Sequence, residues 1–135
     1  MILKLETNEF ALERIDQSLV KAVLRTHMEL TLTHISRFDQ ALEMLASNQA
    51  HGLILDISKV IYIHQEAREF LVHALQTSES TLATALVTET MLSKFAGKLF
   101  LNLHQPLIPI ALFDHHTEAK QWIISSMNNL RVDAA

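Results

Sequence analysis

The chain has 135 residues, of which 49% are apolar and 19% charged, a balance typical of one folded globular domain. Its 11 Lys and Arg against 15 Asp and Glu give a formal net charge of −4, and no basic block is present to bind nucleic-acid phosphates. The lack of cysteine excludes disulfides, thiolate catalysis and cysteine-ligated zinc.

Neither a signal peptide nor a membrane span is apparent. Residues 1–6 have no charged region followed by a long apolar stretch, and no apolar run approaches the roughly 20 residues of a transmembrane helix. We therefore expect one cytoplasmic domain over residues 1–135.

The first elements are a hairpin and a helix. Residues 9–15 and 19–25 read as two short strands around a turn-forming Asp16-Gln17-Ser18 segment. Residues 33–47 then change to helical spacing, with Thr31 or Thr33 available to cap the amino end. The recurring apolar residues of this helix are Ile35, Phe38, Leu42 and Leu45.

Three strand–helix units follow. Residues 52–57 form a nearly unbroken apolar run with one acidic residue, Asp56, near its end. Such a run is typical of a parallel strand buried on both faces. Further strands are predicted at residues 82–87 and 108–113. The three helices that follow these strands have apolar stripes at Ala67, Phe70, Leu71, Ala74 and Leu75, then Leu92, Phe95, Ala96, Leu99, Phe100 and Leu103, then Ala119, Trp122, Ile123 and Met127. Thr117 is the expected cap of the last one.

This order predicts an α/β fold. Alternating strand–helix units require a mostly parallel sheet with right-handed crossovers, and the opening hairpin makes the sheet mixed. We expect a mixed, mainly parallel sheet of about five strands with about four helices.

Two runs of sequence carry a family resemblance. Residues 55–60, Leu-Asp-Ile-Ser-Lys-Val, and residues 63–71 resemble the central segment of SpoIIAA-like, STAS-type domains. The end of the chain is similar to a functionally uncharacterised bacterial branch of that group, and the likeness extends over residues 9–125. The residues that carry this second likeness are 98–103, Pro106, Pro109, Leu112, Phe113, Glu118, Ala119 and Trp122.

The resemblance implies a regulatory function. The best-known members are anti-sigma factor antagonists that are switched by phosphorylation of a serine in an Asp-Ser-Ser-Gly pattern at the start of the second helix. Here that pattern falls on His64-Gln65-Glu66-Ala67, with Glu66 where the serine would be. A carboxylate cannot accept a phosphoryl group, and its charge is fixed at a helix amino terminus, where it is favourable. The resemblance thus implies a protein partner of the sigma-regulatory type or a homodimer, without the phosphorylation switch.

The candidate partner-binding residues lie around this helix start. They are Asp56, Ser58, His64, Gln65, Glu66 and Arg68. Some of them resemble an acid, a nucleophile and a base, but no Gly-x-Ser-x-Gly elbow is present and no glycine adjoins Ser58. Asp56 and Ser58 are better read as residues that bind backbone amides in the turn. We predict no enzymatic activity and no cofactor, because the clustered glycines of phosphate and dinucleotide loops are also absent.

Residues 91–103 suggest a second type of contact. The predicted helix there is more apolar than one buried face requires, and Gly97 weakens its middle by about 1 kcal/mol relative to alanine. Ordinary packing on the sheet is one interpretation; the other is contact with a small apolar ligand or an anionic lipid surface. The candidate contact residues are Lys94, Phe95, Lys98, Leu99, Phe100 and Leu101.

The eight histidines do not form a recognisable metal motif. No HExxH sequence or His-x3-His helix pair occurs among them. His115 and His116 are adjacent in an expected loop, so their side chains should point to opposite sides. We expect no metal site, and we interpret these two as solvated loop residues.

Overall fold

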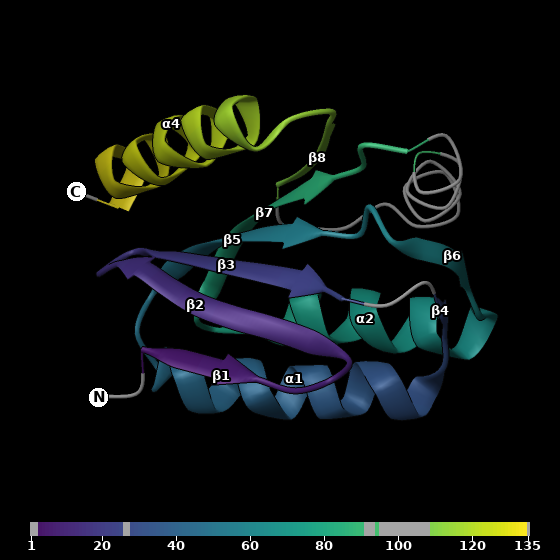
Figure 1. The fold of residues 1–135 in the computed structure, drawn as a ribbon. Coiled ribbons are helices and arrows are strands. Elements are labelled where there is room, and N and C mark those ends of the chain that lie inside the picture. The colour runs from purple at the N-terminus through teal and green to yellow at the C-terminus, as the bar shows by residue number, and fades with distance from the viewer. Residues whose placement is uncertain (1–2, 26–27, 91–93, 95–108, 135) are drawn as a thin grey trace.

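The computed structural model describes residues 3–25, 28–90, 94 and 109–134 (Figure 1). In chain order the elements are β1 (Lys4–Glu6), β2 (Phe10–Asp16), β3 (Leu19–Leu24), β4 (Met28–Leu30), α1 (Leu32–Ala46), β5 (His51–Asp56), β6 (Val60–Ile63), α2 (Gln65–Thr77), β7 (Thr81–Val87), β8 (Ile110–Phe113) and α4 (His116–Ala134).

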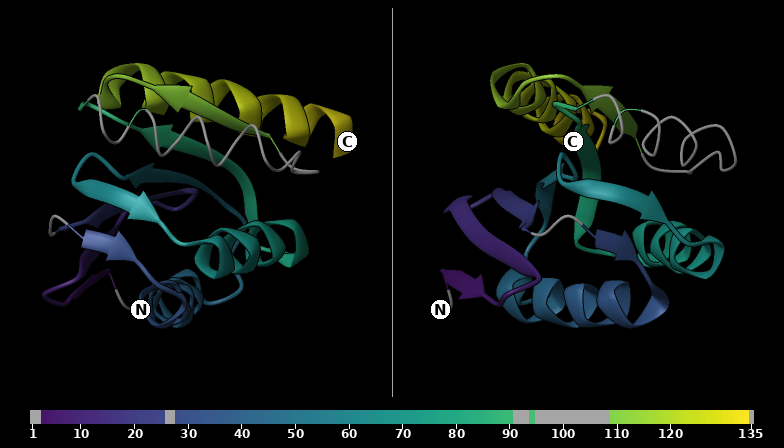
Figure 2. Two further views of the ribbon diagram at one scale, coloured as in Figure 1. Left: turned by 90° about the vertical axis from the view of Figure 1, so that its right-hand side faces the viewer. Right: turned by 45° about the vertical axis from the view of Figure 1, so that its right-hand side comes forward.

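The main sheet has six strands in the order β1-β2-β3-β5-β7-β8. The pairs β1–β2 and β2–β3 are antiparallel, and β3, β5, β7 and β8 run parallel. Helices α1 and α2 lie on one face of the sheet and α4 lies on the other (Figures 1 and 2). The predicted mixed, mainly parallel α/β sheet is confirmed.

The opening hairpin is set by local chemistry. The Asp16 Oδ1 accepts a hydrogen bond from the backbone N–H of Ser18 at 2.8 Å, which closes the turn between β2 and β3. A register shift lies between Arg14 and Asp16. The hairpin predicted from residues 9–15 and 19–25 is therefore confirmed as β2 and β3.

Each face of the sheet has its own apolar core. The larger one joins β2, β3 and β5 to α1 and α2, and Phe10 and Phe38 meet edge to face within it at 5.8 Å. The smaller one lies under α4 and contains Ile54, Ala83 and Ile123. All six residues of β5 are buried, as the apolar run at 52–57 predicts.

The packing of α4 on β5 depends on Gly52. A Cβ atom at this position would overlap the Cγ2 of Ile123 on α4. Gly52 therefore lets the helix approach the backbone of the central strand closely.

The carboxyl end of α1 is held by an arginine from β2. The Nη2 of Arg14 donates to the carbonyl oxygen of Leu45 at 2.6 Å and to that of Ala46 at 3.1 Å. These carbonyls belong to the last turn of α1, where the helix itself supplies no donor. The positive charge of the buried guanidinium also interacts favourably with the negative end of the α1 dipole.

The described residues differ from the sequence prediction in their strands and in one helix cap. The main sheet has six strands rather than about five, and a separate two-stranded parallel sheet pairs β4 with β6. Three helices lie in the described residues, and the fourth expected helix, at 91–103, falls outside them except for Lys94. Helix α4 starts at His116, so Thr117 lies inside its first turn and is not its cap. The unpredicted strands β1, β4 and β6 have three or four residues each, too few for an alternating pattern to be recognised.

His51, at the start of β5, predicts a dependence of stability on pH. Its side chain is fully buried, Nδ1 donates to the Gln49 carbonyl at 2.9 Å, and Nε2 accepts from the Thr81 hydroxyl at 2.9 Å. Burial lowers the pKa of His51 below its ordinary 6.5. The unfolded state therefore binds a proton more readily, so stability is full above pH 6.5 and is lost as the pH falls from there toward the folded-state pKa.

Urea unfolding at about pH 7.5 and about pH 5.5 checks this. We expect a smaller loss of stability on acidification in His51→Gln than in the wild type. The exposed His73 provides the control, and His73→Gln should keep the wild-type pH dependence. Equal pH dependence in all three proteins would contradict the prediction.

We expect a substitution at Thr84 to stabilise the fold. This residue of β7 is fully buried, and its hydroxyl has no hydrogen-bond partner in the part of the chain that the structure describes. Thr84→Val removes the unsatisfied hydroxyl at nearly constant shape and should raise the free energy of unfolding by about 1 kcal/mol. Thr81→Val in the same strand removes the hydroxyl bonded to His51 and should lower it. Thermal and urea unfolding of both variants test the opposite signs.

Candidate functional site

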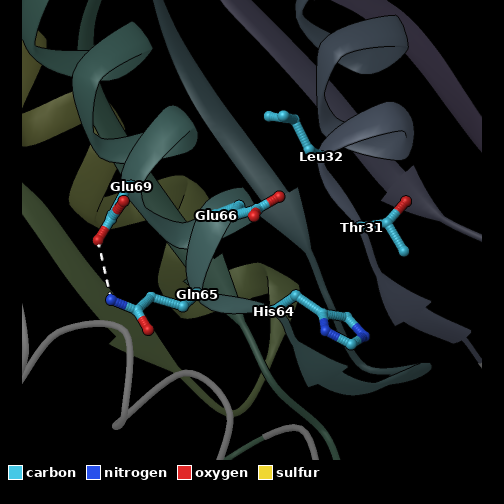
Figure 3. A pocket seen from close by; sticks show the side chains of 6 residues that line it. All are labelled: Thr31, Leu32, His64, Gln65, Glu66 and Glu69. Atoms are coloured by element: carbon cyan, nitrogen blue, oxygen red, sulfur yellow. Dashed lines mark hydrogen bonds between the residues drawn. The ribbon is translucent and has the colours of Figure 1, made fainter.

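A groove lies at the starts of α1 and α2. It has a volume of about 530 Å³, and the residues that line it are Thr31, Leu32, His64, Gln65, Glu66 and Glu69. Figure 3 shows Glu66 extending from α2 toward the start of α1, where Leu32 and Thr31 lie. Gln65 and Glu69 lie on the other side of the same turn of α2, where the Gln65 Nε2 donates to the Glu69 Oε1 at 3.1 Å.

The α1 wall of the groove is fixed by a capping box. The Thr31 hydroxyl accepts from the backbone N–H of His34 at 3.4 Å, and the Thr31 N–H donates to the His34 Nδ1 at 3.2 Å. Of the two threonines expected as caps, Thr31 is the one used. Leu32 follows directly and is 40% exposed, so an apolar side chain faces the groove.

The α2 wall begins differently. His64 is the N-cap residue, but its side chain makes no capping hydrogen bond. Glu66 supplies the acidic charge of the first turn, which interacts favourably with the helix dipole. The Glu66 carboxylate makes no hydrogen bond or ion pair within the described residues.

Aromatic and charged side chains of β4, β6 and α2 lie beside His64, at the edge of the groove. The rings of Tyr62 and His64 meet edge to face at 5.2 Å, and the His64 Nε2 lies 3.6 Å from the Glu29 Oε2. Tyr62 is 39% exposed. The Arg68 guanidinium lies 6.0 Å from the centre of the Tyr62 ring, and its Nη1 donates to the Ile63 carbonyl at 2.8 Å. Arg68 is itself buried, so it fixes the connection from β6 to α2 from inside.

Asp56 and Ser58 lie at the carboxyl edge of the parallel strands and are not among the groove residues. The Asp56 Oδ1 accepts from the Ser58 N–H at 2.8 Å, and the Ser58 hydroxyl accepts from the Glu89 N–H at 3.0 Å. The expected binding of a turn amide is confirmed for Asp56. Ser58 also binds a backbone amide, but one that lies 31 residues away, after β7, and not in its own turn.

Asp56 also contacts the start of α4. Its Oδ2 lies 2.7 Å from the His116 Nε2. The interpretation of His116 as a solvated loop residue is wrong, because this histidine begins α4 and is bonded to a buried carboxylate. His115, beside it, is exposed. Asp56 and His64, which resembled the acid and the base of a catalytic set, have different partners. Asp56 is bonded to His116, and His64 faces Glu29.

Of the residues predicted to contact an apolar ligand or a lipid, only Lys94 lies in the described part of the chain. The Lys94 Nζ lies 2.9 Å from the Asp114 Oδ1, and the Lys94 N–H donates to the Thr90 carbonyl at 2.9 Å. Phe95, Lys98, Leu99, Phe100 and Leu101 lie outside the described residues.

The described residues contain neither a metal site nor a membrane-spanning helix. No set of histidine and acidic side chains there is arranged to hold a metal ion. None of the helices in the same residues combines the length and the apolar character needed to cross a bilayer.

Sequence reasoning missed part of the groove. The sequence does not single out Glu29, Leu32 and Glu69, although they adjoin or line it. Tyr62, a lone aromatic that reads as a core or rim residue, lies beside His64. Glu29 belongs to the three-residue β4, whose pairing with β6 brings it beside His64. Glu69 had a readable signal, because it lies four residues after Gln65 on the same helix face.

Comparisons with known proteins agree with the fold. A family model described as Domain of unknown function (DUF7793) matches residues 14–126. One similar solved structure is an uncharacterized protein of the DUF3478 family with a SpoIIAA-like fold from Shewanella loihica PV-4, with 15% identity, a TM-score of 0.57, and coverage of 84% of this chain and 91% of that chain.

Another is an anti-sigma factor antagonist from Mycobacterium paratuberculosis, with 13% identity, a TM-score of 0.59, and coverage of 83% of this chain and 90% of that chain. The curated proteins contain no match to the chain. The predicted SpoIIAA-like fold is confirmed.

Proposed function

Because the chain belongs to the family described as Domain of unknown function (DUF7793) and has a SpoIIAA-like fold, we propose that it is a non-enzymatic regulatory module that binds another protein. The groove at the starts of α1 and α2 is the contact surface. The proposal depends mainly on one observation. A hollow with an exposed leucine, and with a glutamate that has no partner among the described residues, lies at the helix start that the resemblance implicates. The anti-sigma factor antagonist of similar fold supports a regulatory role.

The proposed site uses His64, Gln65 and Glu66 directly. The buried Arg68 holds the segment before them in place through its hydrogen bond to the Ile63 carbonyl. The hydrogen bond from the Ser58 N–H to Asp56 fixes the turn after β5. Glu66 gives this surface a constant charge in place of a phosphorylated serine, so binding is not switched by phosphorylation at this position.

Matched substitutions on α1 test the proposal. Leu32→Gln changes the groove at a side chain that is 40% exposed. Met44→Gln changes a more exposed apolar side chain, at 58%, near the other end of the same helix. A protein captured by the wild type should be purified and its affinity measured for all three chains. We expect Leu32→Gln to weaken binding by about tenfold, as loss of a central apolar contact does, and Met44→Gln to leave it unchanged. Equal affinity for Leu32→Gln and the wild type would refute the groove as the contact surface.

The other expectations stay predictions. Contact of residues 91–103 with an apolar ligand or an anionic lipid falls on residues outside those described, and Lys94 is already paired with Asp114. Homodimerisation and a cytoplasmic location are likewise part of the proposal.

A further inference from the structure

The groove carries more negative than positive charge. Glu66 and Glu69 line it, and Glu29 lies at its edge beside His64. No lysine or arginine is among the described residues that line it. Arg68, on the same helix as Glu66 and Glu69, is buried and directs its guanidinium to the Ile63 carbonyl.

Helix dipoles do not reverse this balance. The start of a helix is equivalent to roughly half a positive charge, and two helices begin at the groove. Together they amount to about one positive charge, whereas three carboxylates surround the groove. A cationic group is therefore attracted here and an anionic group is repelled.

The three carboxylates are not equally available. Glu69 accepts a hydrogen bond from Gln65 at 3.1 Å, and Glu29 is 3.6 Å from the His64 ring nitrogen. Glu66 alone of the three has no such partner among the described residues, and it extends toward Leu32 (Figure 3). A carboxylate without a partner in the described part of the chain thus faces an exposed aliphatic side chain across the groove.

This combination fits the side chain of arginine. Its aliphatic stem packs on apolar surface while the planar guanidinium binds a carboxylate with two donors. We propose that the groove takes an arginine of a partner protein, with the guanidinium on Glu66 and the stem against Leu32. This inference rests on the proposed function, because it specifies the partner of the same surface.

Short peptides test the charge requirement separately from any natural partner. The probes are acetyl-leucyl-arginine amide, the citrulline peptide, which is neutral and nearly the same shape, and the glutamate peptide. Backbone amide shifts of the ¹⁵N-labelled full chain report where each one binds. We expect the arginine peptide to shift the amides of Leu32, Gln65 and Glu66.

The affinity ratios decide the outcome. Citrulline in the peptide, or Glu66→Gln in the protein, should weaken binding by about three- to fivefold, as expected for one partly exposed ion pair. Glu13→Gln, at an exposed position of β2, should change nothing. Raising the salt concentration should weaken the arginine peptide and leave the citrulline peptide unaffected. Equal binding of the two peptides, shifts elsewhere on the surface, or no shifts at millimolar peptide would overturn the inference.

The two proposals fail in different ways. If a purified partner depends on Leu32 while the arginine and citrulline peptides bind equally, the groove is a partner site without arginine recognition. If the arginine peptide binds as expected but the purified partner has the same affinity for Leu32→Gln as for the wild type, the proposed function fails.

Discussion

The variant Gly52→Ala is expected to unfold at lower urea concentration than the wild type, with a loss of about 1–3 kcal/mol. The added Cβ meets the Cγ2 of Ile123, and both residues lie in rigid elements, β5 and α4. Relief requires the Ile123 side chain to change its rotamer or the helix to move away from the sheet, and either change disturbs the packing of the smaller core.

A double-mutant cycle isolates the cause. Ile123→Ala alone should cost about 2–5 kcal/mol through the lost burial and the cavity left behind. The double variant should be about as stable as Ile123→Ala, because the methyl group that collides is gone. Additive losses would mean that the alanine at position 52 acts through the backbone and not through contact with α4.

The second large effect is expected for Arg14→Met. This substitution keeps most of the buried side-chain volume but removes the donors to the Leu45 and Ala46 carbonyls. Hydrogen bonds from a charged donor contribute about 1.5–3 kcal/mol, and the Leu45 carbonyl, left without a donor among the described residues, adds a further penalty. The Ala46 carbonyl keeps its hydrogen bond from the Gln49 N–H at 2.9 Å. We expect a total loss of about 3 kcal/mol in urea unfolding.

The control is the same substitution at a surface arginine. Arg37 lies on α1, is 61% exposed and forms an ion pair with Glu9 at 2.8 Å. Arg37→Met should cost less than about 1 kcal/mol, because an exposed ion pair contributes little. Similar losses for the two variants would show that the Arg14 hydrogen bonds do not stabilise the end of α1.

The sequence was sufficient to predict elements with a strong period or a strong turn signal. The hairpin around Asp16, the buried run of β5 and the stripes of α1, α2 and α4 all follow from side-chain spacing. The strands β1, β4 and β6 have too few residues for such a signal.

The site was predictable only in part. The resemblance pointed to the start of α2, and His64, Gln65 and Glu66 do lie together in a groove. Its other contributors come from β4 and α1 through tertiary packing, as with Glu29 beside His64. Asp56 and His116 are likewise 60 residues apart in the chain, and no local pattern could pair them.

The walls of the groove are the first turns of two helices that continue into the same core. Ile35 and Phe38 anchor α1 there, and Ala67 and Leu71 anchor α2. The proposed contact surface is therefore already organised before a partner arrives, so we expect this chain to lose little conformational entropy on binding. The ordering cost falls instead on the partner segment, at about 0.5–1.5 kcal/mol for each long side chain that is immobilised. Tighter complexes should accordingly come from rigid partner segments more than from changes in this domain.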